Sequence, residues 1–262
     1  MPELPEVNTF QAYFDQHAIG RPIRRVRVSD QKIIRNMSGR RFAQRLQGRQ
    51  FTGSYRRGKF LFGAMDNGHH VLLHFGMTGD LLAYEDPQEA PRHERFHWAF
   101  ADGGRLGFDC PRKFARILYL DDLDEYLAES GLGEDALRIS LGEFLNIAEG
   151  KTCSVKGFLL NQKYLAGMGN LYADAVCYDT RIHPATSVHR LSPAQLRKLH
   201  RRMQAMLSEA VQRLAQYGEY PSPWYWDWRI EGNKPKKGYG LVKSGKVAGR
   251  TTYWCEGWQE RQ

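Results

Sequence analysis

The sequence predicts an α+β protein in which a mainly β first part precedes a helical part and a small β-hairpin module. Short β-branched and aromatic segments, separated by turn signals, occupy residues 22–120. After the acidic stretch at 121–125, the apolar residues recur at helical spacing. The last stretch, 220–262, mixes prolines, tryptophans and glycines with a basic run. We therefore expect a first domain at 1–125, a linker at 126–139, a helical domain at 140–222 and a hairpin module at 223–262.

The first expected element is a short helix over residues 7–20, because Phe10 and Phe14 lie four positions apart on one helix face. Two β-hairpins are expected further along the first part. The turn signal Asp-Asn-Gly at 66–68 and the signal Asp-Gly-Gly at 102–104 each separate two short apolar segments. The first part is therefore predicted to be built mainly from antiparallel strands.

The clearest helix in the second part is expected over residues 192–217. Ser192 is suited to cap it, Pro193 fits the first helical position, and Gln195 completes a capping-box spacing. Gly218 is suited to end it. One apolar stripe, which predicts a packed face, consists of Leu196, Leu199, Met203, Met206, Leu207, Ala210, Val211 and Leu214.

A further helix is expected to begin near Asn170, directly after the glycine-rich turn at 166–169, with the Asn170 side chain as its cap. Free N–H groups at a helix start attract anions. A glycine-rich helix start is not specific by itself, so this observation alone does not assign a function.

The composition favours a polyanionic partner. The chain has 262 residues, 38 Lys and Arg against 29 Asp and Glu, a net charge of +9 and a pI near 9.4, which points first to nucleic acid. No apolar run approaches the roughly 18 residues of a membrane-spanning helix. The opening residues lack the basic and apolar pattern of a signal peptide, so a cytoplasmic location is expected.

Cysteine and histidine usage gives no sign of a metal site. The four cysteines contain no C-x-x-C pair, which predicts reduced thiols, with neither a disulfide framework nor zinc. The histidines His69, His70 and His74 lack a partner carboxylate or cysteine at ligand spacing. We therefore predict no metal ligands in this chain.

The N-terminus carries the first chemical candidate. Initiator methionine is usually removed before a small residue, which would expose the secondary amine of Pro2. At neutral pH about a tenth of an α-amino group is unprotonated, against well under roughly a thousandth of a lysine amine. Such an amine can attack the anomeric carbon of a nucleoside and form an iminium, a Schiff base, which acidifies the neighbouring sugar proton and permits β-elimination of phosphate. Glu3, beside it, is placed to shuttle protons.

Six stretches of the sequence, taken in order, carry a family resemblance. They are Pro-Glu-Leu-Pro-Glu-Val at 2–7, Arg-Arg-Gly-Lys-Phe-Leu at 56–61, His-Phe-Gly-Met-Thr-Gly at 74–79, Pro-Arg-Lys-Phe at 111–114, Gly-Met-Gly-Asn-Leu-Tyr-Ala at 167–173 and Gly-Arg-Thr-Thr-Tyr-Trp-Cys at 249–255. Together they resemble the formamidopyrimidine-DNA glycosylase and endonuclease VIII family over nearly the whole chain. The resemblance implies an antiparallel β-sandwich with a catalytic N-terminal helix, a helix-two-turns-helix domain and a finger hairpin, with DNA in the cleft between.

The resemblance also implies a bifunctional DNA glycosylase and lyase of base excision repair. Such an enzyme excises an oxidised base from double-stranded DNA, acts on abasic sites, and cleaves the strand by β- and δ-elimination. Pro2 matches the Schiff-base nucleophile and Glu3 the acid/base. Lys59 resembles the hairpin lysine that approaches phosphate and sugar, and Arg250 the finger arginine that grips phosphates and helps the second elimination. A monomer is expected.

Further matches concern contacts with DNA. Asn170 and the backbone amides at 169–171 match a phosphate clamp. Positions that match residues on or near the DNA are Glu6, His74, His93, Arg112 and Lys156. The resemblance implies that Met77, Arg112 and Phe114 fill the hole left by an extruded nucleotide, although from the sequence alone Met77 and Phe114 would be placed in the core.

The finger departs from the family pattern. The usual finger holds zinc through two C-x-x-C pairs, whereas here Cys255 matches the third ligand, Trp258 stands at the fourth, and the first pair is missing from residues 234–240. The resemblance therefore implies a zincless finger and no cofactor. Aromatic side chains that would pack in place of the metal are Trp224, Trp226, Trp228, Tyr253, Trp254 and Trp258.

Lesion preference and two alternative functions stay open. The void-filling residues favour oxidised purines such as 8-oxoguanine, whereas the zincless finger and the short segment 218–228 favour oxidised pyrimidines or ring-opened formamidopyrimidines. A catalytically silent protein that binds damaged DNA would need none of Pro2, Glu3 and Lys59. A basic two-domain protein that binds RNA is supported only by the helix-two-turns-helix resemblance.

Overall fold

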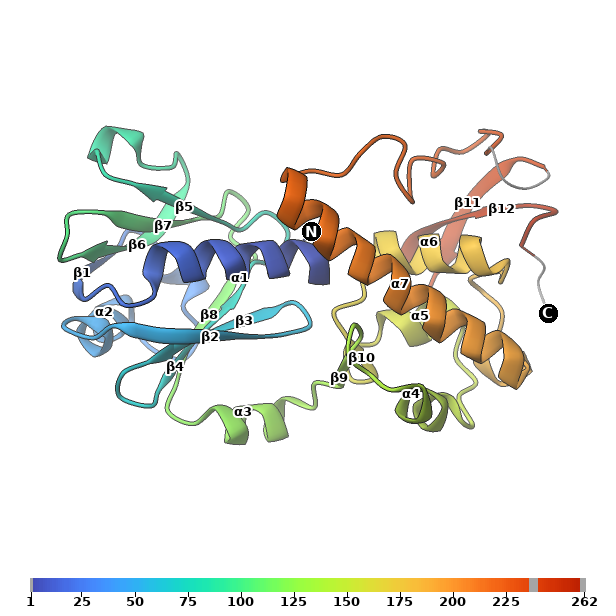
Figure 1. Ribbon diagram of the computed structural model, residues 1–262, viewed down its shortest axis with the longest axis horizontal. Helices are drawn as coiled ribbons and strands as arrows, with labels where there is room; N and C mark the ends of the chain where they lie inside the picture. Colours follow the sequence, from blue (N-terminus) through green and yellow to red (C-terminus); the bar gives the residue numbers. More distant parts are fainter. Residues whose placement is uncertain (1, 236–239, 260–262) are drawn as a thin grey trace. The chain divides into compact units, whose positions relative to one another are not determined.

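The computed structural model describes residues 2–235 and 240–259, without the side chains of 215–217, and the chain forms two compact units, Met1–Gly131 and Leu132–Gln262 (Figure 1). The first unit is an antiparallel β-sandwich of two four-stranded sheets. The strand order of one sheet is β1 (Ile23–Val28), β6 (Glu94–Phe100), β7 (Arg105–Asp109), β5 (Asp80–Tyr84). The order of the other is β2 (Phe51–Arg57), β3 (Phe60–Met65), β4 (His70–His74), β8 (Arg116–Leu120).

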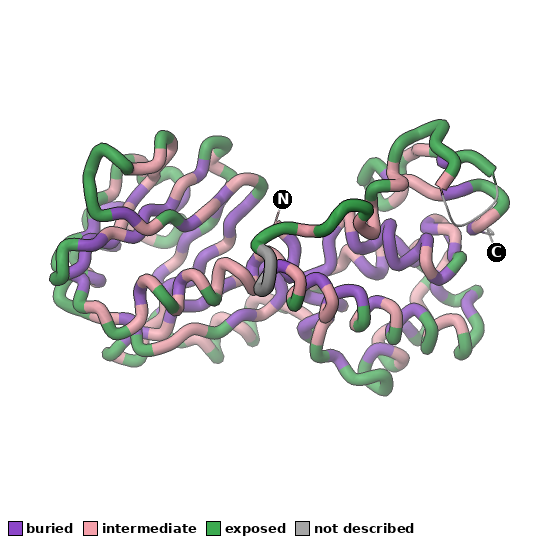
Figure 2. Tube along the Cα trace, turned by 45° about the horizontal axis from the view of Figure 1, so that its top comes forward, coloured by how far each residue is buried: buried purple, intermediate pink, exposed green. Residues whose placement is uncertain are grey.

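Both predicted hairpins are confirmed. The turn at 66–68 joins β3 to β4, which pair antiparallel from Phe60 opposite His74 to Ala64 opposite His70. The turn at 102–104 joins β6 to β7. Alternate side chains of both sheets meet in one core, with the Trp98 ring 4.9 Å from Phe96 and 5.5 Å from Phe51, and buried positions recur along every strand (Figure 2).

The first helix, α1 (Leu4–Ala18), begins three residues earlier than predicted. Glu3 and Glu6 form a capping box, and Pro5 lies in the first turn, where the N–H that proline lacks would have no helical partner anyway. The helix packs against β2 and β5, the edge strands of the two sheets (Figure 1). It buries Phe14 against them. The sequence pattern of apolar residues missed this first turn.

The remaining short elements of the first unit lie around the sandwich. They are the 3-10 helices η1 (Gln31–Ile33) and η2 (Pro87–Glu89), and the helices α2 (Gly39–Leu46) and α3 (Leu123–Ser130). α2 packs against β1. Leu123, Tyr126 and Leu127 of α3 pack against Phe62, Leu72 and Leu120 of the sheet. The predicted linker 126–139 therefore includes more than half of a helix that belongs to the first unit, because the apolar face of α3 is covered there.

The second unit is mainly helical, with a terminal hairpin. Its elements are β9 (Glu134–Asp135), α4 (Leu141–Ala148), α5 (Val155–Leu160), β10 (Leu165–Ala166), α6 (Asn170–Thr180), η3 (Val188–Arg190), α7 (Pro193–Tyr217), β11 (Val242–Val247) and β12 (Arg250–Cys255). β9 and β10 pair in parallel, and β11 and β12 form the expected antiparallel hairpin. No helix in the described part of the chain is both long and apolar enough to cross a membrane.

The long helix α7 confirms the predicted boundaries. Ser192 caps it, the Gln195 side chain accepts from the Ser192 backbone N–H at 2.8 Å, and Gly218 ends it. The prediction for α6 was wrong in one respect. Gly169 is the N-cap residue and Asn170 is the first helical residue, so the Asn170 side chain does not cap the helix. It donates instead to the carbonyl of Thr251, as described below.

Candidate active site

The start of α1 positions Pro2 and Glu3. Pro2 is half-buried, whereas Glu3 is 2% exposed. The Glu3 backbone N–H donates to Glu6 Oε2 at 2.8 Å, and the Glu3 side chain accepts from the backbone of Glu6. Glu6, predicted to lie near DNA, thus has a structural role in this capping box. The two hydrogen bonds fix the backbone directly after Pro2, so the position of its nitrogen is tied to the helix.

The β2–β3 turn lies at the same level as the start of α1. Ile19 bridges Phe51, and Gln11 Nε2 donates to Ser54 Oγ at 3.0 Å, which sets helix and strand side by side. From Gln11 back to Leu4 the helix spans about 10 Å. From Ser54 to the end of β2 the strand also spans about 10 Å. The turn that carries Lys59 therefore meets the end of α1 that carries Pro2.

Lys59 is buried, at 7% exposure, and is not a solvated strand lysine. Arg56 Nη1 donates to the Gly58 carbonyl at 3.0 Å and holds the turn from inside. Burial, together with the positive charges of Arg116 and Lys59, lowers the pKa of His74 to about 4. His74 is therefore neutral near pH 7, and its Nδ1 accepts from the Gly76 N–H at 3.3 Å. This hydrogen bond ties the end of β4 to the loop that follows.

Two touching loops bring together Met77, Arg112 and Phe114. A Cβ atom on Gly76, whose φ is +64°, would lie 2.5 Å from the carbonyl carbon of Phe114, so the loops meet at a glycine. The Arg112 backbone N–H donates to Thr78 Oγ1 at 3.4 Å, and the Arg112 guanidinium lies 5.2 Å from the Phe114 ring. Met77 is 40% and Phe114 54% exposed, so the alternative that places them in the core is wrong.

His93 lies at the base of the Arg112 loop. Its backbone N–H donates to Asp109 Oδ1 at 2.8 Å, and its carbonyl accepts from the Cys110 N–H at 3.1 Å. The side chain is half-buried. His93 therefore joins the predicted group in the first unit through backbone contacts.

Lys156, in the second unit, does not lie where a DNA contact requires it. Its side chain is fully buried, and Nζ lies 2.6 Å from Asp174 Oδ1. Nζ also donates to Thr252 Oγ1 at 2.7 Å and to the Thr251 carbonyl at 3.2 Å. The ammonium is enclosed by protein groups, which contradicts the expectation that it approaches the DNA backbone. Its role is to hold β12 against α5 and α6.

Asp174 is the residue of this cluster that the sequence analysis missed. It pairs with Lys156 and also with Arg229, whose Nη2 lies 2.9 Å from Asp174 Oδ2. The Tyr253 backbone N–H also donates to Oδ2, at 3.3 Å. Burial raises the pKa of Asp174 and lowers that of Lys156, and the opposite charges nearby work against both shifts. One acid in the otherwise apolar stretch 171–178 was the available signal, because a buried carboxylate needs partners.

The same cluster places Asn170 beside Arg250. Asn170 Nδ2 donates to the Thr251 carbonyl at 3.1 Å, the same carbonyl that accepts from Lys156. Arg250, the next residue toward the N-terminus, opens β12 and is exposed. The structure therefore brings both predicted phosphate-binding side chains together at one end of the hairpin, next to the start of α6. A helix start and an exposed guanidinium together favour an anion.

The hairpin is joined to the helices by polar and aromatic contacts. Cys255 is buried, which raises the pKa of its thiol, and its backbone N–H donates to Gln259 Oε1 at 2.8 Å. Gln259 Nε2 donates to the Ile182 carbonyl at 3.0 Å, and Trp258 Nε1 to the Tyr178 carbonyl at 3.0 Å. These contacts tie the end of the hairpin to the end of α6.

Tryptophans of the predicted finger pack against residues of the helical part. Trp228 stacks on Tyr178 with ring centroids 4.3 Å apart, and Trp254 lies 5.0 Å from His183. Among the described residues, no group of three or more His, Cys, Asp or Glu side chains is arranged for a metal. The positions of the missing cysteine pair lie largely in 236–239, outside the described residues. The absence of zinc stays a prediction.

Comparison with known proteins covers both units. The family model described as the formamidopyrimidine-DNA glycosylase N-terminal domain matches residues 1–117, and the model described as the H2TH domain of the same glycosylase matches residues 132–218. A formamidopyrimidine-DNA glycosylase of Arabidopsis thaliana is 31% identical over 273 residues, which cover 96% of this chain and 69% of that protein. One from Herpetosiphon aurantiacus is 32% identical over 218 residues, which cover 81% of this chain and 79% of that protein.

Solved structures show the same fold. The Lactococcus lactis Fpg in complex with DNA that contains an abasic site superposes with a TM-score of 0.88 over 99% of this chain and 100% of that chain, at 23% identity. This likeness establishes the fold, whereas the sequence matches establish the family. The chain belongs to the formamidopyrimidine-DNA glycosylase family.

Proposed function

We propose that this chain, a DNA glycosylase with abasic-site lyase activity by its family, excises oxidised bases from double-stranded DNA through a Schiff base on Pro2. The observation that supports the proposal is the register of α1 against β2, which brings a half-buried Pro2 and a buried Lys59 to one end of the first unit. Solved relatives of the same fold were bound to DNA with an abasic site or with Fapy-dG, so lesion-bearing DNA is the proposed substrate.

The chemistry begins once Met1 is removed, since the nucleophile is the free amine of Pro2. The nitrogen lone pair attacks C1′ of the damaged nucleotide, and the C1′–N glycosidic bond breaks as the base leaves with a proton. Opening of the sugar ring produces an iminium between Pro2 and C1′. Glu3, fixed by the capping box, supplies and removes protons at the sugar. Lys59 brings a positive charge to the phosphate and sugar at the same place.

Strand cleavage follows from the iminium. Loss of a proton from C2′ expels the 3′ phosphate in the β-elimination, and a second proton loss expels the 5′ phosphate in the δ-elimination. Hydrolysis of the imine then returns the free amine. The products are a one-nucleotide gap with phosphates at both ends and an unsaturated sugar fragment. No oxidant or reductant is needed, because each step moves only protons and leaving groups.

Extrusion of the damaged nucleotide is assigned to Met77, Arg112 and Phe114. An unstacked void costs free energy, and two exposed apolar side chains beside a guanidinium are suited to fill it and to hydrogen-bond the partner base. Asn170 and Arg250 grip phosphates from the second unit. Excision rates on duplexes that contain 8-oxoguanine, a formamidopyrimidine or an oxidised pyrimidine measure which oxidised base is preferred.

Borohydride trapping tests this proposal. We expect a covalent adduct between the mature protein and a lesion-bearing duplex, and none when one extra residue is left ahead of Pro2. That extension keeps every side chain but converts the amine to an amide, so it is a matched control. Binding without an adduct would favour a catalytically silent protein that binds damaged DNA. Preference for RNA would favour a basic two-domain RNA-binding protein. A cytoplasmic location and a monomeric state stay predictions.

A further inference from the structure

One segment of the first unit carries a large positive charge. Residues 21–50 contain ten arginine or lysine residues and a single acid, Asp30, so this segment carries a net charge of +9, equal to that of the whole chain. It comprises β1, η1 and α2, and contains none of the residues assigned above to catalysis or to DNA contacts. The proposed catalytic function therefore assigns no role to the positive charge of this segment.

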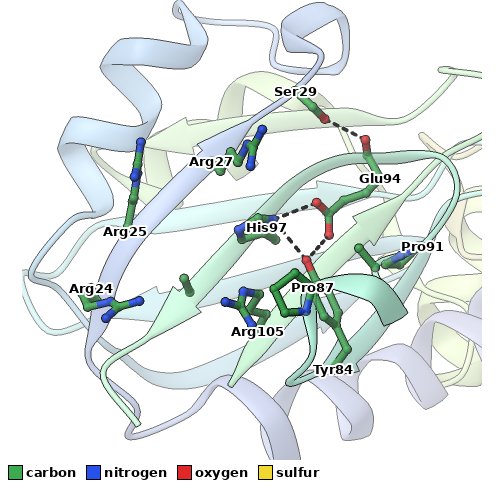
Figure 3. Close-up of a pocket in the computed structure, with 12 residues that line it drawn as sticks. Arg24, Arg25, Arg27, Ser29, Tyr84, Pro87, Pro91, Glu94, His97 and Arg105 are labelled. Carbon is green, nitrogen blue, oxygen red and sulfur yellow. Dashed lines mark hydrogen bonds and ion pairs between the residues drawn. The ribbon is translucent and has the colours of Figure 1, made fainter. Parts of the chain in front are cut away.

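Part of this charge lines a cavity of about 410 Å³ in the first unit, which we name the outer arginine pocket (Figure 3). Arg25 of β1 lies opposite Ala99, which lies opposite Arg105 of β7, and Arg27 lies opposite His97. Because Val26, Trp98 and Leu106 on the same strands point into the core, the pocket lies on the face of the sheet turned away from it. Its cationic lining consists of Arg24, Arg25, Arg27 and Arg105.

The one acid of the pocket forms its close contacts with residues other than these arginines. Glu94 Oε1 accepts from the Tyr84 hydroxyl at 2.6 Å, and Glu94 Oε2 lies 2.7 Å from His97 Nδ1 (Figure 3). Burial opposes ionisation of Glu94, but the hydrogen bonds from His97 and Tyr84, together with the positive charges of His97 and Arg27, outweigh it and keep its pKa below the ordinary value. A Cβ atom on Gly107 would lie 2.5 Å from Glu94 Oε1, so this arrangement depends on a glycine beneath it.

The arginines of β1 remain available. Among the described residues, the side chains of Arg24, Arg25 and Arg27 form no ion pair or hydrogen bond, and all three are exposed. In contrast, Arg21 pairs with Asp102 and Arg45 with Asp121. Three adjacent unpaired guanidinium groups repel one another, which costs free energy that an external anion would remove.

We propose that the outer arginine pocket binds the phosphate backbone of a second nucleic-acid segment, separate from the one that carries the lesion. Arg25 and Arg27 are two residues apart on a strand, so their Cα atoms are about 6.6 Å apart and their long side chains leave the same face of the sheet. Two such cations are suited to neighbouring charges of the regularly charged phosphate backbone. Pro87, Pro91 and Tyr84 form an apolar wall beside the cations. An acidic peptide is the competing ligand, but its carboxylates lack that regular spacing. The proposal does not depend on the Pro2 chemistry.

A second-segment binding assay on the full-length protein tests this proposal. The catalytic site is first saturated with an unlabelled duplex that carries a tetrahydrofuran abasic analogue. Binding of a labelled undamaged oligonucleotide, single-stranded or duplex, is then measured from low to high salt. The test variant is Arg24→Gln, Arg25→Gln, Arg27→Gln. The matched control is Arg190→Gln, Arg197→Gln, Arg201→Gln, which removes the same charge from exposed positions of the second unit.

We expect the pocket variant to bind the labelled probe at least tenfold more weakly than the wild type and the control at low salt. The slope of log K against log salt should fall by about 2 for a single strand, or nearly 3 for a duplex, if each arginine neutralises one phosphate. The unfolding temperature should not change, since the three side chains are exposed. Equal affinity and slope in the pocket variant and the control would overturn the proposal.

Two further outcomes distinguish this proposal from acidic-peptide binding and from the proposed catalytic function. If polyglutamate displaces the probe as well as an oligonucleotide of equal charge does, the site is one for acidic peptides and the proposal is wrong. If the tetrahydrofuran duplex fails to bind at all, the proposed catalytic function is in doubt. The affinity of the labelled probe can still be compared between the pocket variant and the control variant without the tetrahydrofuran duplex. Failure of the catalytic proposal therefore does not conceal the result for the outer arginine pocket.

Discussion

Replacement of Asp174 by asparagine should destabilise the second unit strongly. The change keeps the shape of the side chain but removes the negative charge that pairs with both Lys156 and Arg229, at 2.6 and 2.9 Å. Lys156 and Asp174 are both fully buried, so water cannot compensate. Removing one partner of a buried ion pair costs about 3–5 kcal/mol. For a unit of this size, such a loss lowers the unfolding temperature by about 10–15 °C.

Thermal unfolding followed by circular dichroism and tryptophan fluorescence measures this effect. The matched control is Asp179→Asn, on the same helix, because Asp179 pairs with Arg202 at partly exposed positions. That change should cost no more than about 1 kcal/mol. The double variant Asp174→Leu, Lys156→Met should recover part of the lost stability, because it removes the buried ammonium group together with its partner carboxylate. An unfolding temperature of Asp174→Asn within a few degrees of Asp179→Asn would refute the reasoning.

Four further predictions follow from the site. Because the pKa of His74 is about 4 in the fold and about 6.5 when unfolded, stability should be complete above pH 6.5 and fall by up to about 3 kcal/mol toward pH 4. His74→Gln should remove this part of the acid sensitivity in urea unfolding, and an unchanged pH profile would contradict it. Met77→Ala with Phe114→Ala should reduce base excision at least tenfold while the melting temperature stays unchanged, because both side chains are exposed; a fall in melting temperature would show that they support the fold. Lys59→Met should reduce single-turnover excision more than it reduces binding of a tetrahydrofuran duplex, and equal losses would remove Lys59 from the chemistry. Chelators should leave activity and unfolding unchanged, whereas stoichiometric zinc by elemental analysis would refute the metal-free finger.

The sequence determined the elements whose signals are local. The turn at 66–68 and the boundaries of α7 were predicted correctly, because β-turns and helix caps depend on hydrogen bonds between residues a few positions apart. Pro2, Glu3 and Lys59 belong to recognisable motifs, and the register of α1 against β2 places the two segments side by side. The candidate role of each of these residues is therefore indicated by its neighbours in the sequence.

Only the tertiary structure decided which side chains are covered. Lys156 lies 96 residues from Thr252, and Asp174 lies 55 residues from Arg229, so no local pattern indicates that they share one buried cluster. The same holds for Met77 and Phe114, whose apolar character suggested the core although two touching loops leave them exposed. Burial and ion pairing depend on which distant segments the fold brings into contact. The free energy of those contacts is a property of the packed structure and cannot be read from neighbouring residues in the sequence.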